Sequence, residues 1–169
     1  RVLVSRFVPE DVAADPDALE AAYQEFVELY SAHKEDTTGP YEGVVACMER
    51  LRAAGVHVGV LTNKNHEQAI PLVEKFFPGL FDAVQGRLDT LPAKPAAPMT
   101  RALMEALGAD PESTLMVGDT SVDIACGTNA GIAACGVTWG FRPRTELVEA
   151  GADFIVDTPA ELARLILGE

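Results

Sequence analysis

Apolar residues along the chain follow two spacings that alternate. Short, largely apolar runs of strand length are separated by longer segments in which apolar residues return every three or four positions, as on one face of a helix. The short runs cover residues 56–61, 81–85, 114–117, 132–137 and 154–156. Strands that alternate with helices predict an α/β fold with a mostly parallel, Rossmann-like sheet and helices on both of its faces.

The clearest helix starts lie near the two ends of the chain. Asp15 can cap a helix whose first position is Pro16, and the helical pattern continues to about residue 34. Thr158 is a second strong start, followed by proline and by Glu161 at the third helical position. Further helices are predicted over residues 44–54, 65–77, 99–107 and 122–130, with a short one within 143–150.

A polar break rich in turn-forming residues separates the first long helix from the alternating units. It covers residues 35–40 and ends in Gly-Pro, which disfavours continued helix. We therefore predict two parts, residues 1–38 and residues 39–169. The second part carries all of the predicted strands.

Composition and charge exclude several classes of partner. The 169 residues are 48% hydrophobic and 23% charged, which is ordinary for a globular protein. The net charge of −13 repels nucleic acid and anionic membranes, so neither is predicted as a partner. No apolar run approaches the roughly 18 residues of a membrane-spanning helix. Three cysteines without zinc-like spacing suggest reduced core thiols in a cytoplasmic protein.

Two aspartates follow one of the predicted strands. Asp119 comes directly after Gly118 at the strand's carboxyl end, and Asp123 falls in the first turn of the next helix. Two carboxylates at a strand-to-helix turn suit a hard cation such as Mg²⁺. The alternative is that Asp119 caps the helix and Asp123 is a solvated acid beside the helix dipole.

A second predicted strand also ends in polar residues. Thr62 and Asn63 follow Leu61 and could donate hydrogen bonds to phosphate oxygens, or could simply form a turn and a cap. Lys94 lies in a loop stiffened by flanking prolines, where it could neutralise a bound anion or be an ordinary surface charge. Serine-hydrolase, P-loop and dinucleotide-binding signatures are absent from the sequence.

Three motifs occur in order along the chain: Leu61-Thr62-Asn63-Lys64, then Lys94-Pro95, then Gly118-Asp119-Thr120-Ser121-Val122-Asp123. Together they resemble the haloacid dehalogenase (HAD) superfamily, and most closely its phosphoglycolate phosphatase-like branch. The resemblance extends over essentially the whole chain from Tyr41 onward. Residues 1–38 resemble the C-terminal part of a helical cap domain, which in that family covers the site and selects the substrate.

The resemblance implies a role for each matching residue. Thr62 matches the motif that binds the transferring phosphoryl group, with Asn63 beside it. Lys94 matches the residue that stabilises the phosphate and the covalent intermediate. Asp119 matches the principal metal-binding acid and Asp123 its supporting acid, with Mg²⁺ as the implied cofactor.

The family's first motif, Asp-x-Asp-Gly-Thr, is missing. It supplies the nucleophile from a central strand, and the nearest spacing match, Asp15-Pro16-Asp17, opens a helix instead. In the family that strand lies between the strands that here end at Leu61 and Val117. Without it, two buried strands would lose hydrogen-bond partners at a cost of roughly 1–3 kcal/mol per group. We expect the attacking aspartate to lie on a segment that precedes Arg1.

These features predict a Mg²⁺-dependent phosphatase that hydrolyses a small phosphorylated, phosphoglycolate-like metabolite through an aspartyl-phosphate intermediate. The 169 residues by themselves are expected to be inactive. A phosphomutase or dehalogenase of the same superfamily is an alternative, although the acid pair favours phosphate chemistry. A non-catalytic module that binds phosphate is the alternative from another functional class.

Overall fold

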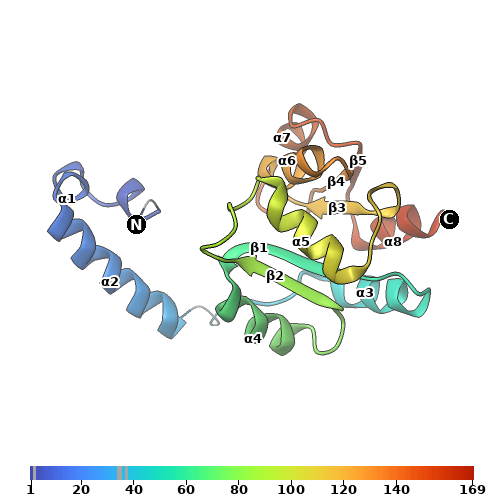
Figure 1. The fold of residues 1–169 in the computed structure, drawn as a ribbon, viewed down its shortest axis with the longest axis horizontal. Helices are drawn as coiled ribbons and strands as arrows, with labels where there is room; N and C mark the ends of the chain where they lie inside the picture. Colours follow the sequence, from blue (N-terminus) through green and yellow to red (C-terminus); the bar gives the residue numbers. More distant parts are fainter. Residues whose placement is uncertain (2, 34–35, 37) are drawn as a thin grey trace. The chain divides into compact units, whose positions relative to one another are not determined.

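The computed structural model describes residues 1, 3–33, 36 and 38–169, in two compact units (Figure 1). The first unit is Arg1–Gly39 and the second is Pro40–Glu169. None of the helices in the described residues is both long and apolar enough to cross a bilayer.

The first unit is helical. It contains a 3₁₀ turn, Val4–Arg6, and the helices α1 (Glu10–Ala14) and α2 (Pro16–His33). Asp15 caps α2, because its Oδ1 accepts hydrogen bonds from the backbone N–H groups of residues 17 and 18. The predicted start of this helix is therefore confirmed, while Lys34, near its predicted end, lies outside the described residues. The assignment of residues 1–38 to a cap domain remains a prediction.

The second unit contains two parallel sheets. Strands β1 (Gly59–Asn65) and β2 (Ala83–Arg87) form one pair. Strands β3 (Leu115–Gly118), β4 (Ala133–Val137) and β5 (Phe154–Val156) form the other sheet, in that order. The parallel α/β class is confirmed, since every strand pairing is parallel.

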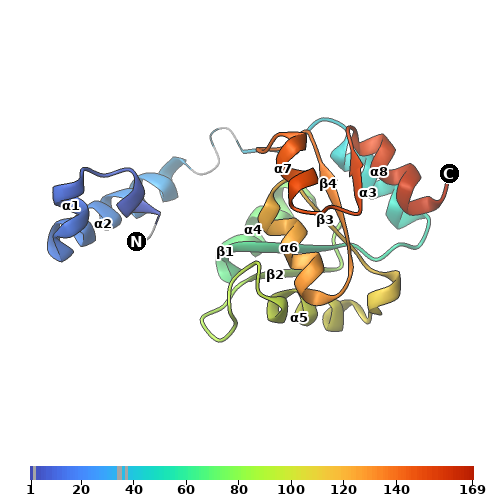
Figure 2. The ribbon, with the colours of Figure 1, turned by 90° about the horizontal axis from the view of Figure 1, so that it is seen from above.

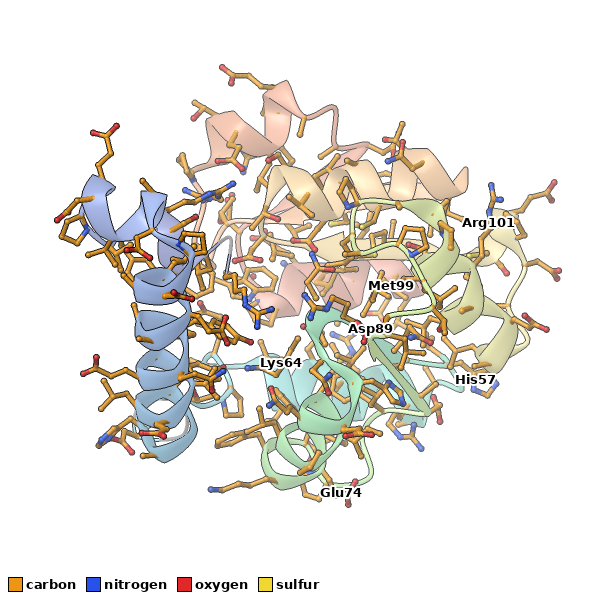
Figure 3. All side chains as sticks on the ribbon, turned by 60° about the vertical axis from the view of Figure 1, so that its left-hand side comes forward. His57, Lys64, Glu74, Asp89, Met99 and Arg101 are labelled. Carbon is orange, nitrogen blue, oxygen red and sulfur yellow. The ribbon has the colours of Figure 1, made fainter. Side chains whose placement is uncertain are left out.

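Helices cover both faces of each sheet. Figure 1 shows α4 (His66–Phe76) and α5 (Ala97–Leu107) on opposite sides of the β1–β2 pair, and both helices contact it. Each helix divides into an inner and an outer face, as Figure 3 illustrates for α5, where Met99 is fully buried and Arg101 is exposed.

The side chains of β4 point alternately to the two faces of the three-stranded sheet, and their contacts show which helices cover each face. Cys135 and Val137 share a core cluster with α3 (Val44–Ala53) and α8 (Pro159–Leu167). Ala134, the residue before Cys135, packs instead with α6 (Ser121–Ala130) and α7 (Arg144–Glu149). Because successive strand residues point to opposite faces, these two helix pairs lie on opposite sides of the three-stranded sheet (Figure 2).

β1 and β2 both begin and end later than the predicted runs, which cover residues 56–61 and 81–85. β1 continues past Leu61 because Asn65 pairs with Arg87 of β2 after an irregular stretch. β2 begins at Ala83, two residues later than expected, because the apolar Phe81 packs edge-on against Phe77 before the strand starts. The apolar runs in the sequence indicate which residues of these strands are buried, but they do not indicate where the backbone pairing begins.

A cavity of about 780 Å³ separates the two sheets. Residues 58–61 line one side and residues 114–118 the other. In the described residues, β1 pairs only with β2 and β3 only with β4, so each has one unpaired edge. Thr100 of α5 also lines this space; it is 3% exposed, and its hydroxyl has no hydrogen-bond partner among the described residues.

Candidate active site

The end of β1 is joined to the proline-flanked loop by a two-way amide contact. Asn63 Oδ1 accepts from the backbone N–H of Lys94 at 2.8 Å, and Asn63 Nδ2 donates to the Lys94 carbonyl at 3.3 Å. The Asn63 side-chain amide is thus hydrogen-bonded to the backbone of Lys94. Asn63 thereby links β1 to the lysine loop, and its role as a phosphate ligand stays a prediction.

Lys94 connects this strand end to the next helix. Its Nζ donates to the carbonyl of Leu61 at 3.2 Å and to Asp123 Oδ1 at 2.6 Å. The side chains of Lys94 and Asp123 are only 11% and 10% exposed. Asn129 of α6 holds the same loop through a 2.9 Å hydrogen bond to the Pro95 carbonyl. Lys94 is therefore a partly desolvated, fixed ammonium group and not a freely solvated surface charge.

Asp123 is engaged at both carboxylate oxygens. Oδ1 accepts from Lys94, and Oδ2 accepts from the Thr120 hydroxyl at 2.7 Å and the Thr120 backbone N–H at 3.2 Å. Thr120 is the N-cap of α6, in a capping box with Asp123, so Asp119 does not cap this helix. Gly118, the last residue of β3, must be glycine for steric reasons, since a Cβ at this position would lie 2.1 Å from Asp123 Cβ.

Asp119 is placed differently from Asp123. Its Oδ2 accepts from the backbone N–H of Phe141 at 2.8 Å, while Oδ1 has no partner among the described residues. Asp119 lines the cavity between the sheets, and it is the one acidic residue among the described residues that do so. An unpartnered carboxylate oxygen at a strand's carboxyl end is a suitable ligand for a hard cation.

Thr62 lies in the irregular stretch of β1, directly after the Leu61 carbonyl that Lys94 contacts. Its hydroxyl accepts from the Lys64 backbone N–H at 3.1 Å, so the hydroxyl hydrogen is available for another acceptor. The structure thus joins Asn63, Lys94 and Asp123 through direct contacts, with Thr62 beside them.

Sequence reasoning missed the partners of two acids. Thr120 was not singled out as the residue that caps α6 and holds Asp123. No role for the backbone of Phe141 was predicted from the sequence either. The available signal was Gly140, a glycine between two aromatic residues three positions after β4, because glycine is common where another group approaches the backbone closely.

Asp119 is the acid with an oxygen available for a cation, because its Oδ1 has no partner among the described residues. No group of three or more metal-ligating side chains occurs among the described residues. Mg²⁺ is often held by one or two carboxylates together with waters and substrate phosphate, so Asp119 could contribute to such a site. The Lys94 ammonium is already paired with the Asp123 carboxylate, so the positive charge of an added cation would help to hold a phosphate beside the pair.

Known proteins share this arrangement of the chain. Residues 9–137 match the model of the haloacid dehalogenase-like hydrolases. A phosphoglycolate phosphatase of Chromobacterium violaceum is 36% identical over 170 residues, covering 97% of this chain and 74% of the relative. An N-acetylmuramic acid 6-phosphate phosphatase of Pseudomonas aeruginosa is 31% identical over 157 residues, covering 89% of this chain and 68% of the relative.

The fold has close counterparts among solved structures. A crystal structure of a protein from Lactobacillus delbrueckii subsp. bulgaricus, assigned to the phosphoglycolate phosphatases, superposes with a TM-score of 0.88 at 35% identity. The match covers 96% of this chain and 67% of that one. The chain therefore belongs to the haloacid dehalogenase-like hydrolase family, within its phosphoglycolate phosphatase-like branch of phosphoric monoester hydrolases.

Proposed function

We propose that this protein is a Mg²⁺-dependent phosphatase that hydrolyses a small phosphorylated metabolite resembling phosphoglycolate, through an aspartyl-phosphate intermediate. The observation that carries the proposal is the Lys94 ammonium, fixed at the end of β1 by Leu61 and Asp123. Close to the same strand ends, Asp119 offers an unpartnered carboxylate oxygen to the cavity. Phosphoryl transfer depends mainly on such positioning and charge neutralisation.

Each residue has a distinct part in this scheme. Lys94 and the Thr62 hydroxyl hold phosphoryl oxygens, and Asp119 holds the cation, which when bound neutralises charge on those oxygens. Asn63 positions the Lys94 backbone, and Asp123 positions the Lys94 side chain. This differs from the direct metal role predicted for Asp123, because both of its oxygens already have partners within the chain.

The attacking carboxylate, in this proposal, belongs to a strand outside residues 1–169 that occupies the cavity between β1 and β3. Two features support it: both strands have an unpaired edge there, and Asp119 is the one acid among the described cavity residues. The carboxylate oxygen forms a bond to phosphorus while the bond from phosphorus to the alcohol oxygen breaks, and that oxygen takes up a proton. Water then cleaves the aspartyl-phosphate to inorganic phosphate and restores the carboxylate.

A complementation assay tests the proposal. The chain is mixed with a labelled peptide in which an apolar strand ends in Asp-x-Asp-Gly-Thr, and phosphate release from 2-phosphoglycolate is measured with and without Mg²⁺. We expect release only with both Mg²⁺ and peptide. A peptide with asparagine in place of the first aspartate should bind equally, as judged by fluorescence anisotropy, and give no turnover. In the active mixture, Lys94→Ala and Asp119→Asn should each lower the rate at least about tenfold, or about 1.4 kcal/mol of barrier.

Three outcomes would contradict the scheme in different ways. Robust hydrolysis by the chain without peptide would show that the nucleophile lies within the 169 residues. If the peptide with the first aspartate binds but no phosphate is released, the proposed reaction is wrong. A requirement for a bisphosphorylated activator would identify a phosphomutase instead.

A further inference from the structure

We infer that the loop after β4, residues Trp139, Gly140 and Phe141, is a positioning device for Asp119 that leaves one carboxylate oxygen free for the cation. This inference rests on the proposed metal role of Asp119. It goes beyond the family motifs, because it concerns the backbone N–H of Phe141 and the absence of a Cβ at Gly140.

The contact geometry leaves little freedom to the Asp119 carboxylate. The Phe141 backbone N–H donates to Oδ2 at 2.8 Å. A Cβ added to Gly140 would lie 2.2 Å from that same oxygen and 2.5 Å from Asp119 Cγ. Heavy atoms do not approach so closely without displacement, so any larger residue at position 140 must push the carboxylate out of place. The glycine and the amide together fix which oxygen is held and which remains available.

The side chain of Phe141 does not explain the contact. Phe141 is 84% exposed, so packing of its side chain does not account for its position beside Asp119. The amide N–H is the group that reaches the carboxylate. A preoriented carboxylate matters for Mg²⁺ in particular, because this ion requires near-ideal octahedral geometry and a preorganised ligand loses less freedom on binding.

Mg²⁺ binding can be measured without any catalytic turnover. Trp139 is the chain's single tryptophan and is adjacent to Gly140, so its fluorescence reports on this loop. Titration with Mg²⁺ is compared for wild type, Gly140→Ala and Phe141→Pro, the last of which removes the amide donor. Phe141→Ala keeps the amide, and Gly39→Ala makes the same glycine substitution where no atom lies within 4 Å of the new Cβ.

We expect Gly140→Ala and Phe141→Pro to weaken Mg²⁺ binding at least tenfold, and Phe141→Ala and Gly39→Ala to change it less than twofold. Asp119→Asn should abolish the response. If Asp119→Asn binds Mg²⁺ like wild type, the proposed metal role fails. If Asp119→Asn loses binding while Gly140→Ala and Phe141→Pro retain it, the metal role stands and the positioning inference is overturned.

Thermal unfolding of every variant separates loss of binding from loss of fold. If Gly140→Ala and Phe141→Pro both fail to fold, hydrogen exchange of the Phe141 amide decides the question. Protection in wild type that disappears in Asp119→Ala supports the inference, whereas equal exchange in the two proteins overturns it.

Discussion

The buried ion pair between Lys94 and Asp123 shows how single residues set this site. The pair joins the loop before α5 to the first turn of α6, and the side chains are 11% and 10% exposed. A desolvated charge is tolerated there only because it has a charged partner, since removing one member of such a pair leaves the other buried and unpaired. The pair thus serves both the fold and the proposed phosphate site.

Asp123→Asn should therefore destabilise the protein by about 3–5 kcal/mol, because the Lys94 ammonium would lose its counter-charge. Urea unfolding at neutral pH measures the effect. Glu112→Gln, at an exposed position, is the matched control and should change the free energy of unfolding by less than about 0.5 kcal/mol. Similar losses in the two variants would show that the pair has no special role.

The sequence singles out charged side chains near strand ends more readily than residues whose contacts involve distant backbone groups. Lys94, Asp119 and Asp123 were identifiable because each has a charge at a fixed place relative to a strand or a proline. The roles of Asn63 and Phe141 could not be identified, because they depend on which backbone groups meet across more than 20 residues of chain.

At the level of elements, local signals predicted helix starts well. Asp15 and Thr158 cap their helices through the backbone N–H groups that the sequence pattern implied. Strand ends were less predictable, since pairing with a distant partner determines where a strand begins. Asp82 is an example, because it accepts from the Val58 N–H at 2.8 Å and so fixes the entrance to β1 next to β2.

This contact predicts a pH-dependent contribution to stability. The Val58 backbone N–H and, next, Arg52 hold the pKa of Asp82 below its ordinary value of 3.8. A carboxylate with a lowered pKa stabilises the fold above its ordinary pKa, and that contribution is lost as pH falls through the folded-state pKa. The stability difference between wild type and Asp82→Asn should therefore be largest at neutral pH and should shrink in acid.

Urea unfolding of both proteins across this range measures the difference. The exposed Asp89 provides the comparison, and Asp89→Asn should show no such trend. A difference for Asp82→Asn that stays constant from neutral pH into acid would refute the linkage.

At the scale of the whole molecule, the parallel α/β architecture followed from the alternation of strands and helices. The division of the strands into two sheets did not follow from that alternation, but it agrees with the gap that the family resemblance implies where the strand of the missing first motif would lie, between β1 and β3. The core around the sheets is otherwise well formed and contains all three cysteines as buried free thiols.

Burial of these thiols predicts low reactivity. Desolvation raises the pKa of Cys135 to about 11 and also raises the pKa of Cys126. Both side chains are inaccessible in the native state. A thiol reagent at mildly alkaline pH should modify neither residue until urea unfolds the chain, as peptide mass mapping would show. Rapid modification of either cysteine in the native protein would contradict the packing described here.

In the proposed function, Thr62, Lys94 and Asp119 surround one phosphoryl group and its cation. NMR of the isotope-labelled chain, titrated with inorganic phosphate at saturating Mg²⁺, tests this arrangement. We expect the amide signals of these three residues to shift together with a single dissociation constant, and Lys94→Ala to abolish all three shifts. Shifts that saturate independently, or that are confined to one of the three segments, would contradict it.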